Sequence, residues 1–457
     1  MKGQNIMDKI TVNEIIAATD GELICGSMDA YARNVSIDSR EVTNDTLFVA
    51  LKGENSDGHN YIDKAFENGA SIVISEKNII GSGAVVKVEN SSKALGEIAK
   101  FYKKKLNLKT VAVTGSVGKT TTKDMLSAVM NMQYNTLKTE GNFNNELGLP
   151  LTILRLKNTH EAAVLEMGMS EFGEIDYLAN IARPDVSIIT NIGMSHIENL
   201  GSQEGIFKAK TEICNYFNKD SLLIVNADDK YLKNALNFKG FSVIGYGIET
   251  DCRYKARDIE NLGLDGTKFS VDIYEREYRI HVKTPGVHNV YNALAAIACG
   301  VHYNIGPNKI VEGIENFSLT KMRMSVEKTG RVTIINDCYN SSPDSVNAAL
   351  KVLATQDTRK VAVLGDILEM GEFAKDAHYK IGENVAKNNI DVLITAGENA
   401  KFIAEGAKID EVYSFDTTDE LVSNISKFIK ENDTVLVKAS RGMHFEKIVE
   451  KITEENK

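Results

Sequence analysis

Short apolar runs alternate with amphipathic helical patterns along most of the chain, and this alternation constrains the fold more than any other feature. In the middle of the chain the apolar runs fall at 110–115, 162–168, 185–193 and 221–229, with helical stretches between them. Continuous apolar runs of this length indicate strands that are covered on both faces. The pattern therefore predicts an α/β fold with a parallel, doubly wound sheet.

The alternation starts again near residue 320, which indicates a second series of parallel strands. Strand and helix patterns then follow one another to the chain end, as in Rossmann-like domains, where ligands sit at the carboxyl ends of the strands. Before residue 107 shorter strand runs mix with helices, and the polar stretch 250–285 predicts a few antiparallel strands. A length of 457 residues suits about three domains. We predict an α/β chain of three domains, with boundaries 1–107, 108–319 and 320–457.

Charge and cysteine content exclude several classes of protein. With 53 Lys and Arg against 63 Asp and Glu, the net charge of −10 provides no general attraction for nucleic acid or an anionic membrane. The five cysteines form no C-x-x-C pair, so neither a thiolate metal cage nor a disulfide framework is predicted. No secretory leader pattern and no run of about 18 apolar residues occurs. We therefore expect a cytoplasmic protein without membrane insertion.

The sharpest local motif is Thr-Gly-Ser-Val-Gly-Lys-Thr-Thr at 114–121, between a strand and a helix. In a P-loop of this kind, backbone N–H groups and the helix N-terminus bind phosphate oxygens, the lysine neutralises charge and a threonine hydroxyl reaches Mg²⁺. Val113 stands where the standard pattern has glycine, so the motif is a shortened variant; the alternative is a chance glycine-rich turn. The predicted nucleotide-binding residues are Gly115, Ser116, Val117, Gly118, Lys119, Thr120 and Thr121.

Three further residues are candidates for chemistry beside this loop. Glu166 ends a predicted strand, where a carboxylate could hold a metal ion, and His196 follows the next strand. Lys210 lies fourteen positions after the histidine, inside a predicted helix. Taken singly, each also has an ordinary interpretation: a solvent-facing glutamate, a structural histidine and a surface lysine. Their order along the chain is what gives them weight.

The succession of these motifs resembles the Mur ligase family. The P-loop, the strand-end glutamate, the histidine with its helical lysine and the segment Gly-Val-His-Asn-Val-Tyr-Asn at 286–292 appear in the family order over nearly the whole chain. Within the family, the similarity is greatest to members that add D-alanyl-D-alanine to UDP-N-acetylmuramoyl-tripeptide. Five segments carry this narrower similarity: 38–40, 47–62, 139–146, 337–343 and 363–382.

The resemblance implies roles for the residues of the P-loop and its neighbours. Lys119 would bind the phosphates of ATP, while Thr120, Glu166, His196 and Lys210 would hold one or two Mg²⁺ ions. Lys210 matches the family lysine that carries a carbamate derived from CO₂, which replaces a positive charge by a carboxylate, a hard oxygen ligand for Mg²⁺. The implied catalytic residues are Lys119, Glu166, His196 and Lys210. Lys208 would face another side of the same helix.

The resemblance also implies contacts for the rest of ATP and for the substrate. His288, Asn289 and Asn292 would lie beside the adenine, and Arg323 and Asp337 would contact phosphate and ribose as the C-terminal domain closes. Met322 stands where many relatives have glycine, and Asn340 begins Asn-Ser-Ser-Pro where relatives commonly have Asn-Ala-Asn-Pro. The implied substrate contacts are Ser39 and Arg40 for the uridine diphosphate, Thr139, Asn142 and Asn144 for the sugar peptide, and Asn340.

By this resemblance, the N-terminal domain would bind the UDP-linked substrate, the central domain would be a P-loop ATPase and the C-terminal domain would complete a ligase for peptidoglycan precursors. The substrate carboxylate would attack ATP to give an acyl phosphate, which the amine of D-alanyl-D-alanine would then attack. His196 and Asp344 both stay open as the base. Another amino-acid-adding Mur ligase, a folate polyglutamate ligase or a catalytically silent nucleotide-binding scaffold are the alternatives. We expect a monomer; the third residue of the peptide stays open.

Overall fold

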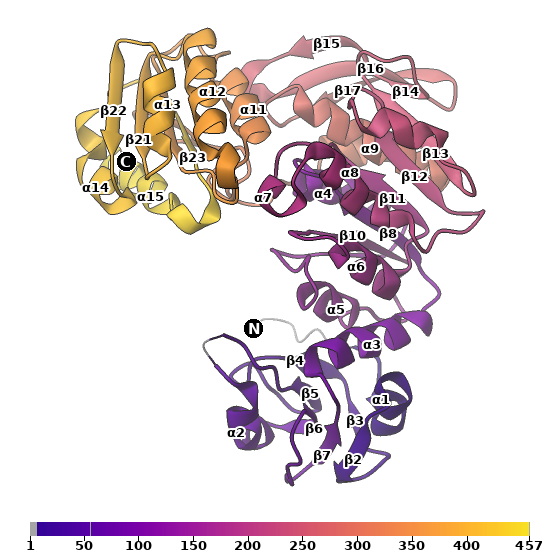
Figure 1. Ribbon diagram of the computed structural model, residues 1–457. Helices are drawn as coiled ribbons and strands as arrows, with labels where there is room; N and C mark the ends of the chain where they lie inside the picture. The colour runs from indigo at the N-terminus through magenta and orange to yellow at the C-terminus, as the bar shows by residue number, and fades with distance from the viewer. Residues whose placement is uncertain (1–6, 55, 457) are drawn as a thin grey trace.

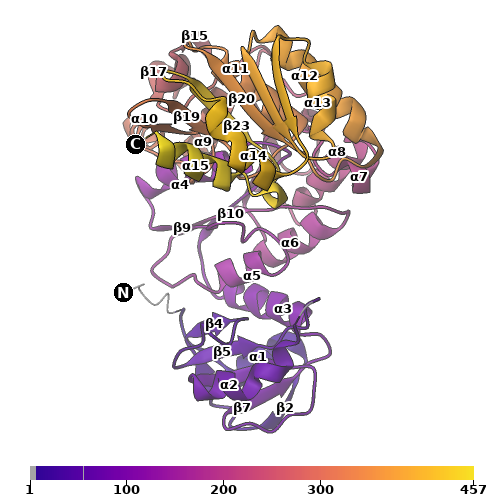
Figure 2. The same ribbon diagram turned by 90° about the vertical axis from the view of Figure 1, so that its left-hand side faces the viewer.

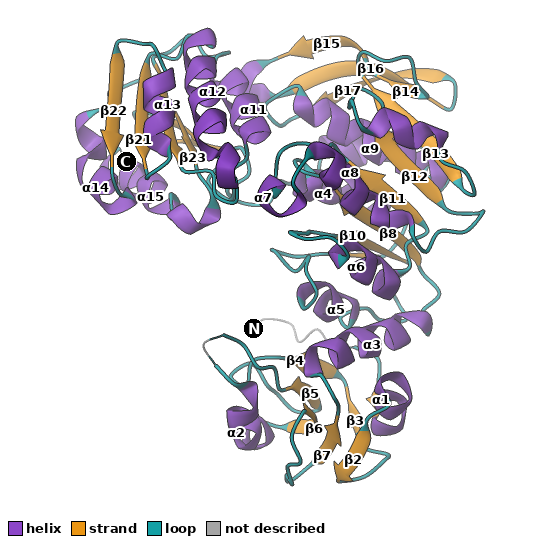
Figure 3. Ribbon diagram, viewed as in Figure 1, coloured by secondary structure: helices purple, strands orange, loops and turns teal. Residues whose placement is uncertain are grey.

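Three α/β units follow one another in the computed structural model, which describes residues 7–54 and 56–456 (Figure 1). The N-terminal unit forms one end of the molecule, the central unit lies in the middle, and the C-terminal unit lies beside the central one. In the turned view the C-terminal sheet lies in front of the central domain (Figure 2). Figure 3 shows that helices flank the sheets of both larger units. The predicted fold class, α/β with three domains, is confirmed.

The N-terminal domain is built around a five-stranded sheet of order β2-β7-β6-β5-β4, in which β2 alone is antiparallel to its neighbour. Its strands are β2 (Glu22–Cys25), β4 (Asn34–Ser36), β5 (Thr46–Val49), β6 (Ala70–Ser75) and β7 (Ala84–Lys87), with a separate pair β1 (Ile10–Thr11) and β3 (Tyr31–Ala32). The helices are α1 (Val12–Thr19), α2 (Ile62–Glu67) and α3 (Ser91–Lys104). Helix α3 packs against the central domain, where Gly96 leaves the space that the Tyr177 hydroxyl fills.

The central domain contains a parallel sheet of seven strands, in the order β14-β13-β12-β11-β8-β10-β9. The strands are β8 (Lys109–Thr114), β9 (Thr136–Lys138), β10 (Ala162–Glu166), β11 (Val186–Ile189), β12 (Leu222–Asn226), β13 (Ser242–Gly247) and β14 (Tyr254–Lys255). All residues of β10, β11 and β12 are buried, as their continuous apolar runs predicted. The strand that precedes the P-loop, β8, lies between β10 and β11, so segments from three strand ends converge on that loop.

Helices cover both faces of this sheet, and a separate small antiparallel sheet lies beside β14. The helices are α4 (Lys119–Asn131), α5 (Gly148–Ile153), α6 (Glu174–Ala182), α7 (Ile197–Leu200), α8 (Gln203–Thr211), α9 (His288–His302) and α10 (Pro307–Glu315). The strands β15 (Arg257–Asn261), β16 (Thr267–Ile273) and β17 (Arg276–Val282) pair antiparallel. The prediction for the polar stretch 250–285 is therefore confirmed, and Phe269 and Val271 share a buried core with α9.

The C-terminal domain has a six-stranded sheet of order β18-β19-β23-β20-β21-β22, parallel except for β18. Its strands are β18 (Ser325–Lys328), β19 (Thr333–Asn336), β20 (Lys360–Gly365), β21 (Val392–Ala396), β22 (Glu411–Phe415) and β23 (Thr434–Lys438). Its helices are α11 (Pro343–Leu353), α12 (Ala374–Lys387), α13 (Ala400–Gly406), α14 (Thr418–Asn424) and α15 (Glu446–Glu455). The Rossmann-like alternation is confirmed, whereas β18, a short antiparallel edge strand, was not predicted.

Both interdomain boundaries expected from the sequence fall in loops, at 107–108 between α3 and β8 and at 319–320 between α10 and β18. The exact division remains a prediction. All five cysteines are free. Within the described residues, no helix has the length and apolar character needed to cross a membrane.

Candidate active site

A large cavity lies between the central and C-terminal domains, at the carboxyl ends of both main sheets. Its volume is about 1310 Å³, above the range of about 300–1,000 Å³ that single small-molecule sites usually occupy. The central domain contributes the P-loop, the end of β10, the segments after β11 and β12 and the start of α9. The C-terminal domain contributes the segments after β19, β20 and β23. The cavity therefore has room for more than one ligand.

The P-loop is fixed from behind by the segment that follows β11. Asn191 accepts the Val117 N–H through its Oδ1 and donates to the Val117 carbonyl through its Nδ2, both at 2.9 Å. Gly118 has a φ of 86°, and a side chain at Gly115 would overlap the Thr190 hydroxyl. Gly118 is thus required by its left-handed backbone conformation, and Gly115 by the close packing of this turn. The loop opens α4, whose free N–H groups and dipole favour an anion at this end.

Val113 lies inside β8, paired with Glu166 and Ile188 of the two neighbouring strands. The turn therefore begins later than in the standard phosphate-binding loop, which accounts for the missing glycine. Lys119 donates from its Nζ to the Gly115 carbonyl at 2.7 Å. Burial lowers the pKa of Lys119, an effect that Glu166 opposes and Arg323 reinforces. The lysine is held at the loop, among the residues that line the cavity.

Glu166 is buried at the end of β10, so the solvent-facing interpretation is wrong. Its Oε1 accepts hydrogen bonds from the Thr120 hydroxyl at 3.2 Å and from the Asn144 amide at 3.0 Å. Its Oε2 is buried and has no hydrogen-bond partner among the described residues. The Lys123 ammonium lies 3.9 Å from this oxygen, too far for a hydrogen bond. A buried carboxylate oxygen that accepts no hydrogen bond is a favourable ligand for a cation. Asn142 also lines the cavity, whereas the Thr139 hydroxyl lies behind Glu166 and accepts its backbone N–H at 3.0 Å.

His196 precedes α7 in a left-handed conformation, with φ of 61°. Its Nδ1 lies 2.6 Å from the Oε2 of Glu369, which comes from the C-terminal domain. The close approach of His196 lowers the pKa of the Glu369 carboxyl, although burial raises it. The sequence did not indicate Glu369, because only the approach of the two domains brings it to the histidine.

Lys210 is 1% exposed, while Lys208 on the same helix is exposed, so the predicted difference between the two is confirmed. In the part of the chain that the structure describes, the Lys210 ammonium forms no ion pair or hydrogen bond. Burial, reinforced by Lys119, lowers the pKa of Lys210 well below its usual range. Among the described residues, Lys210 forms no surface ion pair with Glu204 or Glu212. The Glu212 carboxylate instead accepts the backbone N–H of Gly173.

The three residues expected beside adenine lie at the start of α9 and line the cavity. The Asn292 amide donates to the Asn289 Oδ1 at 2.9 Å, and its own Oδ1 accepts the Thr122 hydroxyl at 3.0 Å. The contact with Thr122 holds α9 against α4. Burial lowers the pKa of His288 to about 4, so its imidazole is neutral at pH 7. The site can therefore present uncharged donors and acceptors at this wall.

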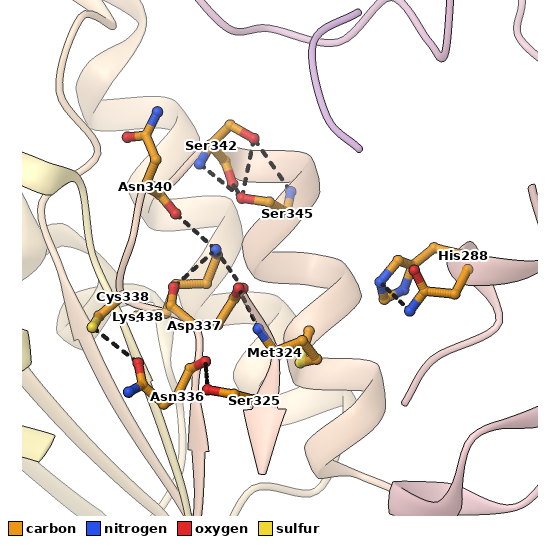
Figure 4. Close-up of polar contacts among 11 residues, drawn as sticks. His288, Met324, Ser325, Asn336, Asp337, Cys338, Asn340, Ser342, Ser345 and Lys438 are labelled. Atoms are coloured by element: carbon orange, nitrogen blue, oxygen red, sulfur yellow. Dashed lines mark hydrogen bonds and ion pairs between the residues drawn. The ribbon is translucent and has the colours of Figure 1, made fainter. Parts of the chain in front are cut away.

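In the C-terminal domain, Asp337 is the centre of a polar cluster (Figure 4). Its Oδ1 accepts the Met324 N–H at 3.0 Å, and its Oδ2 lies 2.6 Å from the Nζ of Lys438. Lys438 is 2% exposed and also donates to the Asn340 carbonyl at 2.9 Å. The sequence did not single out Lys438, because its role depends on the contact with Asp337, which lies far from it along the chain. Ser342 accepts the Ser345 N–H and caps α11, in the position where relatives commonly have asparagine.

Arg323 reaches the central domain from the segment that joins the two domains. Its Nη2 donates to the Thr120 hydroxyl at 3.2 Å, and its guanidinium lies 4.1 Å from the centre of the Tyr339 ring. Met322 takes a φ of 60°, so the chain keeps here a backbone conformation that glycine adopts most easily. The Thr120 hydroxyl is thus the point where Glu166 and Arg323 meet.

The N-terminal candidates lie apart from this cavity. Ser39 is buried, and its carbonyl accepts a hydrogen bond from Asn68 at 2.8 Å. The Arg40 side chain is 86% exposed and pairs with Asp38 at 2.6 Å, which lowers the pKa of that carboxyl to about 2. A smaller hollow of about 390 Å³ lies in the same domain and includes Arg33. The structure therefore does not bring Ser39 and Arg40 to the large cavity.

The cavity wall includes Ser116, Val117, Gly118, Lys119, Thr120, Thr121, Asn142, Asn144, Glu166, His196, His288, Asn289, Asn292, Arg323, Asp337 and Asn340. Gly115, Thr139 and Lys210 are not among the residues that line the cavity. Among the described residues, no three His, Cys, Asp or Glu side chains converge to form a metal cage. A cation at Glu166 would need its other ligands from hydroxyl groups, from water or from a bound phosphate.

Comparison with known proteins covers almost the entire chain. Residues 32–109 match the model described as Mur ligase family, catalytic domain; residues 113–300 match the Mur ligase middle domain; and residues 322–441 match the Mur ligase, glutamate ligase domain. The UDP-N-acetylmuramoyl-tripeptide–D-alanyl-D-alanine ligase of Bacillus subtilis is 39% identical over 98% of this chain and 99% of that relative.

Solved structures agree with this similarity. The crystal structure of MurF from Acinetobacter baumannii has 31% sequence identity and a TM-score of 0.92, and it covers 98% of this chain and 99% of that one. MurF ligase from Thermotoga maritima in complex with ADP has 28% identity and a TM-score of 0.84, over 93% of this chain and 98% of that one.

Proposed function

The chain belongs to the Mur ligase family, and we propose that it joins D-alanyl-D-alanine to UDP-N-acetylmuramoyl-tripeptide at the expense of ATP. The observation that carries this proposal is the full-length agreement with ligases of that name, in sequence at 39% identity and in structure at a TM-score of 0.92. Agreement over all three domains includes the C-terminal domain, whose cavity wall faces the P-loop. The product would be a precursor of peptidoglycan.

ATP would bind with its phosphates at the P-loop and its adenine at the start of α9. Lys119 and Arg323 both approach the first turn of α4, where the negative charge of the phosphates would gather. The amides of Asn289 and Asn292 would face the base, and Asp337 would accept a ribose hydroxyl. Lys438 would keep the Asp337 carboxylate in position through its ion pair.

The residues beside the P-loop fit Mg²⁺. Mg²⁺ usually takes one or two carboxylates together with phosphate oxygens and water, and Glu166 offers a buried oxygen without a donor beside the Thr120 hydroxyl. His196 would join the site if it exchanges its contact with Glu369. When bound, the ion would withdraw charge from the transferring phosphate. The ligand set is thus proposed as Thr120, Glu166, His196 and a modified Lys210.

The reaction would proceed in two steps in a site from which water is excluded. A carboxylate oxygen of the tripeptide attacks the γ-phosphorus, the bond to ADP breaks, and an acyl phosphate forms. The amine of D-alanyl-D-alanine then attacks the acyl carbon, the bond between carbon and phosphate oxygen breaks, and inorganic phosphate leaves with one oxygen of the original carboxylate. Lys119 and Arg323 would stabilise the charge that develops in the first step.

Lys210 is proposed to carry a carbamate. Its amine would add to CO₂ and release a proton, which converts a buried cation into an anion. Burial at 1% exposure and the nearby charge of Lys119 both disfavour the ammonium form. A carbamate would instead be attracted to Lys119 and to a bound cation. These environmental effects support the modification over an unmodified lysine.

The N-terminal domain is proposed to hold the uridine diphosphate through Ser39 and Arg40, and Asn142, Asn144 and Asn340 are proposed to contact the rest of the substrate. Thr139 would act indirectly, through the backbone of Glu166. We also propose the domain division at 107–108 and 319–320. Because ATP and a UDP-linked precursor are cytoplasmic compounds, and because the cysteines are free, the proposed location is the cytoplasm.

The proposal can be tested by following phosphate release from ATP with the purified chain. Release should require UDP-N-acetylmuramoyl-tripeptide and D-alanyl-D-alanine together, and single amino acids should not replace the dipeptide. Activity with a single amino acid on a shorter UDP-linked peptide would indicate another Mur ligase, and activity on a folate would indicate a polyglutamate ligase. Nucleotide binding without turnover on any of these substrates would indicate a silent scaffold.

A further inference from the structure

A buried group of charges lies one helical turn below the P-loop and takes no part in the mechanism above. Lys123 and Asp124 of α4 are 1% and 3% exposed, and the Lys123 Nζ lies 3.2 Å from the Asp124 Oδ1 and 3.9 Å from the Glu166 Oε2. Lys138 of β9 adds a second cation at 2.7 Å from the same Asp124 oxygen. Charged groups are rarely buried unless they are paired. Two lysines thus fix the position of the Asp124 carboxylate.

The other oxygen of Asp124 faces the segment that joins the central and C-terminal domains. The Thr320 hydroxyl donates to the Asp124 Oδ2 at 2.7 Å. Burial alone would raise the pKa of Asp124, but Lys123, Lys138 and Thr320 together lower it. A hydrogen bond to an ionised acceptor is stronger than one between neutral groups. Thr320 is therefore held to α4 by a strong contact.

The spacing of these residues gives the linker a second contact with the same helix. Arg323 follows Thr320 by three positions and donates to the Thr120 hydroxyl at 3.2 Å. Thr120 and Asp124 are four residues apart on α4 and so lie on one face, one turn from each other. The linker thus crosses this face at two successive points, Thr320 at Asp124 and Arg323 at Thr120.

The backbone around Arg323 is bent in a way that needs support from its surroundings. Met322 and Met324, which flank it, have φ values of 60° and 51°. Residues with side chains seldom adopt this region, and they keep it only where the surrounding structure fixes it. Anchoring Thr320 on Asp124 supplies such a fixed point immediately before the bend.

We propose that Asp124 is a positioning residue that anchors the interdomain linker through Thr320 and thereby places Arg323 at the nucleotide site. Lys123 and Lys138 orient Asp124 for this contact. The inference rests on the proposed function for the identity of the ligand, since Arg323 is taken to meet the phosphates of ATP. The linker would accordingly pivot after Thr320, at the bend formed by Met322 to Met324, and Thr320 itself would stay on α4.

A double-mutant cycle on the full chain tests the anchor. Binding of the non-hydrolysable ATP analogue AMP-PNP with Mg²⁺ is measured by calorimetry for wild type, Thr320→Val, Arg323→Ala and the double variant. Thr320→Val keeps the side-chain shape and should weaken binding about tenfold, which corresponds to about 1.4 kcal/mol. Because both changes remove the contribution of Arg323, the double variant should bind no more weakly than Arg323→Ala alone.

Thr355→Val is the matched control, because it makes the same change at a hydroxyl that donates to the Val352 carbonyl at 2.7 Å, just after α11 and outside the cavity wall; it should change binding less than twofold. Asp124→Asn supplies a second variant, expected to weaken binding in the same direction as Thr320→Val. If Thr320 only supported the fold, Thr320→Val would lower the unfolding temperature, and its effect on AMP-PNP binding would add to the effect of Arg323→Ala.

Additive effects of Thr320→Val and Arg323→Ala, or binding by Thr320→Val within twofold of wild type, would overturn the anchor. If wild type does not bind AMP-PNP at all, both the anchor and the proposed nucleotide site are wrong. If the cycle shows coupling but no ligase product forms, the anchor stands and only the proposed function fails.

Discussion

Replacement of Lys438 by methionine should destabilise the C-terminal domain strongly. The change keeps most of the side-chain volume but removes a buried ammonium that lies 2.6 Å from Asp337 and 2.9 Å from the Asn340 carbonyl. Breaking a buried ion pair by removing one partner costs about 3–5 kcal/mol, because the other charge is left without compensation. The Asp337 side chain is 12% exposed and can reach water in the cavity, so we expect about 3 kcal/mol, the lower end.

The free energy can be read from thermal unfolding. For a domain of this size, a loss of 1 kcal/mol lowers the unfolding temperature by about 2–4 °C, so Lys438→Met should lower it by roughly 6–12 °C. The chain contains no tryptophan, and circular dichroism is therefore a better probe than fluorescence. Adding Asp337→Asn should recover part of the loss, since it removes the charge that Lys438→Met leaves buried.

Lys447→Met is the matched control in the same domain. Its partner Asp419 lies 2.8 Å away, but the two side chains are 51% and 80% exposed, and solvent-exposed pairs of this kind contribute little to stability. If Lys438→Met shifts the unfolding temperature no more than Lys447→Met does, the assignment of Lys438 as a buried, compensating charge is refuted.

Three further predictions concern the nucleotide site. Lys119→Ala should abolish phosphate release while circular dichroism shows an unchanged fold, because the lysine acts on phosphate charge; normal turnover with normal AMP-PNP affinity would reject its role. Lys210→Ala should lose most activity, and acetate or formate should restore part of it by occupying the space of the proposed carbamate; near-normal turnover of the variant would contradict the modification. The pKa of His288 is lowered to about 4, so between pH 6.5 and 4 the unfolded chain binds a proton that the folded chain does not. The free energy of unfolding should therefore decrease as the pH is lowered from 6.5 to 4, by up to about 3 kcal/mol at pH 4. Unfolding temperatures of His288→Gln should depend less on pH there, and an identical dependence would refute this.

Features that depend on local sequence could be predicted. The strand before the P-loop, the glycines of the turn and the position of Glu166 at a strand end follow from apolar runs and from spacing, and the structure contains the corresponding elements. The difference between Lys208 and Lys210 follows from helical periodicity alone. These are properties of single elements, in which neighbouring residues determine the outcome.

Features that depend on contacts between distant segments could not be predicted. Lys123 lies one turn into the helix that begins at the P-loop, and in the sequence it resembles a surface lysine. The packing of β9 and β10 against α4 nevertheless buries it. Glu369 reaches His196 only because the central and C-terminal domains meet. Lys438 reaches Asp337 only because the ends of β23 and β19 lie side by side. The short edge strand β18 was missed because four residues carry too little pattern to be distinguished from a loop. Thr139 was expected at the substrate, but its hydroxyl accepts the backbone N–H of Glu166.

The central claim, ligation through an acyl phosphate, is tested most directly by isotope transfer. UDP-N-acetylmuramoyl-tripeptide is labelled with heavy oxygen in its terminal carboxylate and incubated with the chain, ATP, Mg²⁺ and D-alanyl-D-alanine. Mass spectrometry then measures the label in the phosphate released. The account predicts one labelled oxygen atom per phosphate, matched by one new peptide bond to the dipeptide. Formation of the peptide with unlabelled phosphate, or release of phosphate without the peptide, would contradict it.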